Sequence, residues 1–198
     1  NKSDFLFRNL NISINPGKIL CISGSNGDGK TTLSKILMGI LEPSAGEVLV
    51  DGTNLNKLSL KWWKKQVSYI PQNPNILNSS IMDNILLGND KLNEQEVSRL
   101  LQTVGLDQKL KKTSLTILDP IEDNLSKGVK KKIHYARALA QNSKIFIIDD
   151  PFGYLDDQGI QIVQKIIESF KRANKTVILF SDNNILSNVI DENIRIGN

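Results

Sequence analysis

The residues from Gly24 to Thr31 have the types and spacing of a phosphate-binding loop. They read Gly-Ser-Asn-Gly-Asp-Gly-Lys-Thr, which fits the pattern Gly-x-x-x-x-Gly-Lys-Ser/Thr. Glycines let backbone N–H groups turn inward around phosphate oxygens, and the start of a helix adds partial positive charge. The pattern predicts a nucleoside triphosphate with Mg²⁺, in which Lys30 reaches the β- and γ-phosphates, Thr31 faces the metal and Thr32 lies near the α-phosphate. The predicted ligand-binding residues of this segment are Gly24, Ser25, Asn26, Gly27, Asp28, Gly29, Lys30, Thr31 and Thr32.

Two acidic residues follow a second apolar run. Ile145–Ile148 is continuously apolar and is followed directly by Asp149 and Asp150. A phosphate site of this kind needs a carboxylate at the end of a neighbouring strand to hold Mg²⁺. We therefore predict Asp149 as a metal-side carboxylate and Asp150 as the base that polarises water. The alternative is a strand that simply ends in an acidic turn before Pro151.

Strand and helix patterns alternate along the chain and would position these residues. Strand–helix alternation favours an α/β domain with a mainly parallel sheet. We expect strands at Ile19–Ser23, Glu47–Asp51, Val67–Ile70, Ile145–Ile148 and Thr176–Phe180. Apolar residues at helical spacing predict helices over Leu33–Leu41, Val97–Val104 and Ile162–Phe170. Residues 75–140 are strand-poor, which predicts a helical insertion into the α/β core.

Composition indicates an ordinary globular protein. Of 198 residues, 39% are hydrophobic and 23% charged, and the formal net charge is +4. This mild positive charge is weak evidence for nucleic acid, because a surface near a membrane or an anionic ligand explains it equally well. The single cysteine, Cys21, rules out a disulfide within the chain and is expected to be a buried strand residue. No apolar run approaches the ~18 residues that span a bilayer.

The sequence begins with Asn1 rather than Met, within the strand-like apolar segment Phe5–Phe7. We therefore expect one domain taken from a longer protein.

The order of motifs resembles the nucleotide-binding domain of ABC transporters. After the phosphate loop come Tyr69-Ile70-Pro71-Gln72, Leu125-Ser126-Lys127-Gly128, Ala136-Arg137-Ala138-Leu139, Ile145–Pro151 and Leu155-Asp156. The resemblance covers nearly the whole chain, and the stretches Trp62–Gln72 and Ser79–Gly88 look most like the exporter type. It implies a P-loop NTPase (RecA-like) core with a mainly parallel sheet, a small antiparallel β subdomain and an inserted helical subdomain. The core would comprise about residues 1–74 and 141–198, and the helical subdomain about 75–140.

The resemblance also implies roles and partners. ATP and Mg²⁺ would be the cofactors, and Gln72 would contact Mg²⁺ or the attacking water. Ser126 and Gly128 would face the ATP of a second nucleotide-binding domain in a head-to-tail pair, homo- or heterodimeric, although both are also suited to a helix N-terminus. A transmembrane domain of the same or an associated chain would be the other partner. No nucleic acid is expected, and the domain would be a soluble unit at the cytoplasmic face of a membrane.

Two positions near the expected γ-phosphate depart from the family pattern. Asp150 stands where the family has Glu, which retracts the carboxylate by roughly 1.5 Å, and a shift of about 1 Å can cost on the order of a hundredfold in rate. Asp182 lies in the loop where the family has a His, and an ionised Asp there would repel the γ-phosphate. The only histidine, His134, is expected to be a packing residue.

The family's signature motif, here Leu125-Ser126-Lys127-Gly128-Val129, also departs from the family pattern. Lys127 replaces a glycine and Val129 a glutamine, so Lys127 would either add charge near the partner's ATP or hinder its approach. The run Lys130-Lys131-Lys132 is predicted to be a solvated helix face. The aromatic that stacks on adenine is expected upstream of the chain, with Phe5 and Phe7 as possible substitutes that fit the core better.

The sequence thus predicts an ATP-binding domain of an ABC exporter, driven by ATP-dependent dimerisation, with weak ATPase activity. One alternative is a non-catalytic regulatory module paired with an active partner domain. Another is a family relative acting on DNA or ribosomes, which lacks support because the chain has neither long coiled coils nor a tandem domain.

Overall fold

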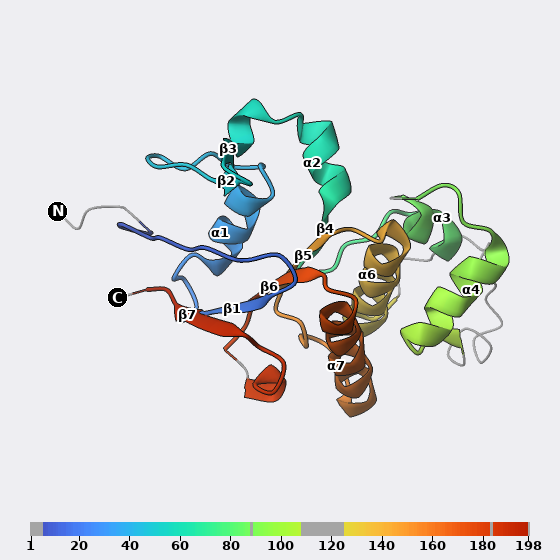
Figure 1. Cartoon of the computed structure of the whole chain (residues 1–198). Helices are drawn as coiled ribbons and strands as arrows, with labels where there is room; N and C mark the ends of the chain where they lie inside the picture. The colour runs from blue at the N-terminus through green and yellow to red at the C-terminus, as the bar shows by residue number, and fades with distance from the viewer. Residues whose placement is uncertain (1–5, 88, 108–124, 183, 198) are drawn as a thin grey trace.

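The structure is a computed structural model that describes residues 6–87, 89–107, 125–182 and 184–197. Strands and helices alternate along the described chain (Figure 1). The strands are β1 (Ile19–Ser23), β2 (Leu49–Val50), β3 (Thr53–Asn54), β4 (Val67–Ile70), β5 (Ile145–Asp149), β6 (Thr176–Phe180) and β7 (Glu192–Arg195). The α-helices are α1 (Lys30–Leu37), α2 (Leu60–Gln66), α3 (Ile81–Leu86), α4 (Glu94–Thr103), α6 (Lys127–Gln141) and α7 (Asp157–Arg172), with short 3₁₀ turns η1 (Leu55–Lys57) and η2 (Asn184–Leu186).

The main sheet is parallel and has the order β4-β5-β6-β1-β7. Each neighbouring pair in it runs parallel, and β2 and β3 form a separate antiparallel pair. The predicted fold class, with a mainly parallel sheet and a small antiparallel β element, is confirmed. Parallel pairing places the carboxyl ends of β1, β4, β5 and β6 along one edge of the sheet.

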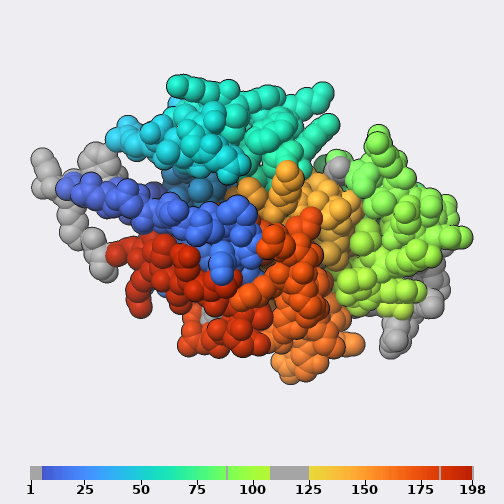
Figure 2. Space-filling model, in the orientation of Figure 1, coloured from blue at the N-terminus to red at the C-terminus, as the bar shows by residue number. Residues whose placement is uncertain are grey.

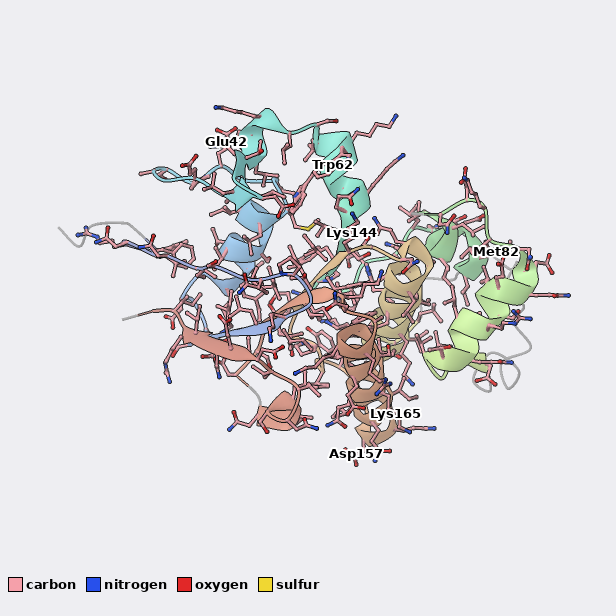
Figure 3. All side chains as sticks on the ribbon, viewed as in Figure 1. Glu42, Trp62, Met82, Lys144, Asp157 and Lys165 are labelled. Atoms are coloured by element: carbon pink, nitrogen blue, oxygen red, sulfur yellow. The ribbon has the colours of Figure 1, made fainter. Side chains whose placement is uncertain are left out.

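Helices cover both faces of this sheet, because successive strand residues point to opposite sides. Cys21, Ile148 and Leu179 pack with α6 and α7 on one face. Ile22 and Ile147 pack with α1 and α2 on the other face. Trp62 on α2 and Asp157 at the start of α7 mark these two helical layers in Figure 3.

Helices α3 and α4 pack against α6 and form one end of the molecule, shown in green in Figure 2. Asn84 on α3 is completely buried and bonds to both the N–H and the carbonyl of Leu77, while Arg137 on α6 donates to the Asn84 carbonyl at 2.7 Å. This part of the chain is helical, as predicted. The proposed boundaries at 75 and 140 stay a prediction, and residues 88 and 108–124 lie outside the described residues. No helix in the described ranges combines the length and apolarity that a membrane span requires.

Several element boundaries differ from the prediction. The strand expected over Glu47–Asp51 is only two residues long, because Asp51 and Gly52 both have positive φ (48° and 78°) and turn the chain into β3. An Asp-Gly pair with two positive φ angles is typical of a tight hairpin. The α1 helix ends at Leu37, so Ile40 and Leu41 lie beyond it and are exposed. Leu6 and Phe7 lie outside any strand, and Phe5 lies outside the described residues.

One lysine of the run on α6 is buried, so the prediction of a solvated face is wrong for it. Lys131 is 0% exposed, and its Nζ donates to the carbonyls of Pro71 (2.8 Å), Asp149 (3.1 Å) and Asp150 (2.8 Å). One helical turn later, Tyr135 donates to the Pro151 carbonyl at 2.9 Å. Because burial disfavours the charged form, the pKa of Lys131 falls to about 8, although the nearby carboxylates of Asp150 and Asp149 oppose the shift. This ammonium joins the exits of β4 and β5 to α6.

The Lys131→Ala variant should lose about 3 kcal/mol of unfolding free energy, because three buried carbonyls lose their donor. The neighbouring Lys130→Ala variant is the matched control and should change stability by less than about 0.5 kcal/mol. Urea denaturation of both variants at pH 7 measures the difference. Equal stabilities would contradict the assigned contacts.

His134 makes stability depend on pH. It is 7% exposed, and its Nε2 lies 2.7 Å from the Asn75 carbonyl, as expected for a packing residue. Burial, with Arg137 and Lys131 nearby, lowers the pKa of His134 to about 4 even though the Asn75 carbonyl favours the protonated ring. The folded-state pKa lies below the unfolded value of about 6.5, so stability is fully present above pH 6.5 and falls as the pH drops toward 4.

Between pH 7 and pH 5, the unfolding free energy of the unsubstituted chain should therefore fall by about 2 kcal/mol more than that of the His134→Gln variant. The reason is that His134 takes up a proton in this range only when the chain is unfolded. Since the sequence has a single histidine, its ring resonances can be followed directly by NMR in an untagged chain. A ring that titrates near pH 6.5 would contradict this assignment.

Candidate functional site

A cleft of about 770 Å³ opens at the carboxyl edge of the sheet. It brings together most of the predicted site residues, although they come from four separate segments of the chain. The predicted residues that line it are Ser25, Asn26, Gly27, Gly29, Lys30, Thr31, Thr32, Gln72, Asp149, Asp150 and Asp182. Leu6, Phe180, Ser181 and Asn184 complete the lining.

The predicted phosphate loop joins β1 to the N-terminus of α1, as the motif requires. Gly29 is the residue before the helix and has φ +91°, a conformation that favours glycine. A Cβ on Gly29 would also lie 2.6 Å from the Phe7 ring. Phe7 therefore packs behind the loop as a partly buried residue, whereas its neighbour Leu6 lines the cleft.

Lys30 begins α1 and donates to three acceptors of this chain. Its Nζ donates to the Gly24 carbonyl, to the Ser25 carbonyl at 3.3 Å and to Asp182 Oδ2 at 2.9 Å. The Gly24 N–H donates to the other Asp182 oxygen at 2.7 Å. Gly24 thus lies at the base of the loop, beside Asp182.

Thr31 and Asp149 form the centre suited to Mg²⁺. Thr31 Oγ1 donates to Asp149 Oδ2 at 2.8 Å, and Asp149 is 3% exposed. Burial raises the pKa of Asp149, while the Thr31 hydroxyl and the Lys131 and Lys30 ammonium groups oppose the rise. Hydroxyl and carboxylate oxygens suit Mg²⁺, which usually takes one or two carboxylates and completes its shell with phosphate and water. The described residues hold no cluster of three or more His, Cys, Asp or Glu side chains that could hold a metal ion.

Asp150 and Gln72 line the same cleft as this centre. Asp150 has φ +51°, and its N–H donates to the Phe180 carbonyl at 3.0 Å, so β6 fixes its backbone. Gln72 follows β4 and is exposed on the cleft. The Asp150 carboxylate is one methylene shorter than that of a Glu.

Asp28 does not line the cleft. Its carboxylate accepts the Ser25 N–H at 2.6 Å within the loop, and the Asp28 N–H donates back to the Ser25 carbonyl. The sequence predicted a ligand contact at Asp28. In the structure, the Asp28 carboxylate instead accepts the Ser25 N–H, a loop donor that a phosphate would also bind.

Ser126 and Gly128 line a separate pocket of about 180 Å³, with Tyr154 and Asp156. Ser126 is the N-cap of α6 and accepts the Val129 N–H at 3.3 Å, and a Cβ on Gly128 would lie 2.6 Å from the Tyr154 carbonyl. Within one chain, these two residues therefore do not meet the phosphate loop.

Sequence reasoning missed two contacts beside these motifs. Lys127 Nζ lies 4.6 Å above the Tyr154 ring, and the Tyr154 hydroxyl donates to Asn73 Oδ1 at 2.8 Å. The contacts of the buried Lys131 were the second feature missed. The sequence did contain an indication of its burial, because Lys131 lies on the same helical face as Tyr135 and Ala138. Tyr154 gave no comparable signal, because its φ of +68° and its partners depend on the tertiary fold.

Comparisons with known proteins agree with this geometry. The family model described as ABC transporter matches residues 7–153. A putative ABC transporter ATP-binding protein of Pyrococcus furiosus is 32% identical over 98% of this chain and 74% of its own length. ABC transporter B family member 26, chloroplastic, of Arabidopsis thaliana is 34% identical over 85% of this chain and 24% of its own length.

The chain spans about 14% of the length of some other relatives, such as ABC transporter B family member 14 of Arabidopsis thaliana. Among solved structures, a bacterial Atm1-family ABC exporter with ATP bound superposes with a TM-score of 0.82 at 22% identity, over 91% of this chain and 32% of that one. The family match covers most of the chain and includes both the phosphate loop and the acidic end of β5, so the chain belongs to the ABC transporter family.

Proposed function

We propose that this chain is the ATP-binding domain of an ABC exporter, that it binds Mg·ATP in the cleft at the carboxyl edge of the sheet, and that it hydrolyses ATP slowly. The observation that carries the proposal is the convergence of Lys30, Thr31, Gln72 and Asp149 on one cleft. The names of the relatives support a transporter assignment, since several are ABC transporter B family members, and the solved structure of similar fold is an ABC exporter with ATP bound.

Each residue has a distinct part in binding. The N–H groups of the loop and the N-terminus of α1 would receive phosphate oxygens, and the Lys30 ammonium would lie between the terminal phosphates. Thr31, Asp149 and Gln72 would hold Mg²⁺. The ion would neutralise negative charge on the phosphates.

Slow hydrolysis follows from the groups that would activate water. Asp150 reaches about 1.5 Å less far than Glu from the same backbone position, and the backbone bond to Phe180 restrains it from moving forward. Asp182 adds a negative charge beside Lys30 where a neutral or positive donor would favour charge development.

Dimerisation completes the proposal. Ser126 and Gly128 lie in a pocket separate from the cleft, so they can serve a triphosphate only in another copy or a related domain. The partners would be a second nucleotide-binding domain and a transmembrane domain, which would place the chain at the cytoplasmic face of a membrane. The ion pair between Asp182 and Lys30 also favours a second candidate, a regulatory module that binds ATP while a partner domain performs the useful hydrolysis.

The Lys30→Ala variant should bind Mg·ATP at least tenfold more weakly, because it removes the cation that lies between the phosphates. Lys35→Ala is the matched control, since Lys35 lies on the same helix and is exposed. Isothermal titration calorimetry on all three proteins, with thermal denaturation to verify folding, measures the effect. Equal affinities in the native chain and Lys30→Ala would contradict the proposed site.

A further inference from the structure

The phosphate loop already carries an anionic partner supplied by this chain. One Asp182 oxygen accepts the Gly24 N–H at 2.7 Å and the other accepts the Lys30 ammonium at 2.9 Å. The Lys30 ammonium, which lines the cleft, is a donor that the terminal phosphates engage in such a loop. The Asp182 carboxylate therefore occupies a donor that the terminal phosphates of a ligand require, while its bond to the Gly24 N–H holds it in place.

The ionised form of Asp182 is the one that fits these contacts. Its slight burial acts to raise the pKa of Asp182, but the Gly24 N–H and the Lys30 ammonium lower it below its ordinary value, and Arg195 adds to the lowering. The side chain is 55% exposed, so the carboxylate remains hydrated when it separates from Lys30. The contact is thus a displaceable ion pair rather than a buried one.

The surroundings of Asp182 add negative charge. Among the described residues that line the cleft, Lys30 is the one lysine or arginine, against the three acids Asp149, Asp150 and Asp182. Inside the loop, the Asp28 carboxylate also occupies the Ser25 N–H. Each further negative charge on a ligand near Lys30 therefore meets repulsion that a neutral side chain at position 182 would not exert.

We propose that Asp182 is an internal competitor of the terminal phosphate, so that this cleft accepts a nucleoside diphosphate at least as readily as a triphosphate. A triphosphate must displace Asp182 from Lys30 or lie beside its charge. A diphosphate places less charge there and leaves more of the ion pair in place. The inference rests on the proposed nucleotide site and names the residue that sets its preference between the two ligands.

The size of the effect follows from charge and exposure. Two unit charges about 4 Å apart at a protein surface interact strongly enough to change an affinity on the order of tenfold, even after screening by water. Removing the charge of Asp182 should therefore tighten triphosphate binding by about tenfold and diphosphate binding by less than about threefold.

The test measures dissociation constants for Mg·ATP and Mg·ADP by isothermal titration calorimetry on the native chain and on Asp182→Asn, which keeps the shape of the side chain. Asp191→Asn is the matched control, because Asp191 likewise accepts one backbone N–H, from Ile19, and pairs with lysines, Lys18 and Lys171, at the opposite end of β1. Thermal denaturation verifies that each variant is folded.

The expected result is a native chain that binds ADP at least as tightly as ATP, and an Asp182→Asn chain whose preference moves toward ATP by several-fold, with no such move in Asp191→Asn. An unchanged ratio in Asp182→Asn, or a native chain that already prefers ATP strongly, would overturn the role of Asp182 while nucleotide binding stands. If neither nucleotide binds to the native chain or to Asp182→Asn, the proposed function and this inference are both overturned.

Discussion

Parallel pairing of the central strands is the constraint on which the site depends. In the order β4-β5-β6-β1, the carboxyl ends of all four strands lie along one edge. The loop after β1, Gln72 after β4, the acids after β5 and Asp182 after β6 consequently meet in one cleft. Gly24 and Asp182 are 158 residues apart in the sequence, yet they share a hydrogen bond because β1 and β6 are neighbours.

The edge of the sheet is held together by polar contacts as well as by apolar packing. Lys131 joins the carbonyls at the exits of β4 and β5 from the α6 side, and Thr31 joins α1 to Asp149 from the other side. Both contacts lie where strand ends leave backbone or carboxylate oxygens away from water, and such groups are costly without donors. Displacement of the Lys131 or Thr31 side chain would therefore shift Asp149, the proposed metal ligand.

The core strands could be predicted because burial on both faces imposes a strong pattern. β1, β4 and β6 have the predicted bounds, and β5 is one residue longer, through Asp149. β7 carries no such pattern, since Glu192, Asn193 and Arg195 are exposed and the strand depends on pairing with β1. The antiparallel pair was shortened by the Asp51-Gly52 turn, whose positive φ angles no apolar pattern encodes.

The residue types of the site were predictable, but their pairing was not. Motif spacing indicated Lys30, Thr31 and Asp149, because phosphate and Mg²⁺ chemistry restricts which side chains serve. Motif spacing did not reveal that Asp182 and Asp28 occupy donors of the loop, since hydrogen-bond partners depend on tertiary distances. The burial of Lys131 was missed because a run of lysines usually lies on a solvated surface.

We propose that binding and hydrolysis are separable at this site. The groups that would hold Mg·ATP converge in the cleft, whereas Asp150 is short and Asp182 adds repulsion. The most direct measurement is single-turnover phosphate release from Mg·ATP with the chain in excess, comparing the native protein with Asp150→Glu. We expect slow phosphate release by the native chain, and release on the order of ten- to a hundredfold faster in Asp150→Glu. Rapid release by the native chain, unchanged by the substitution, would contradict it.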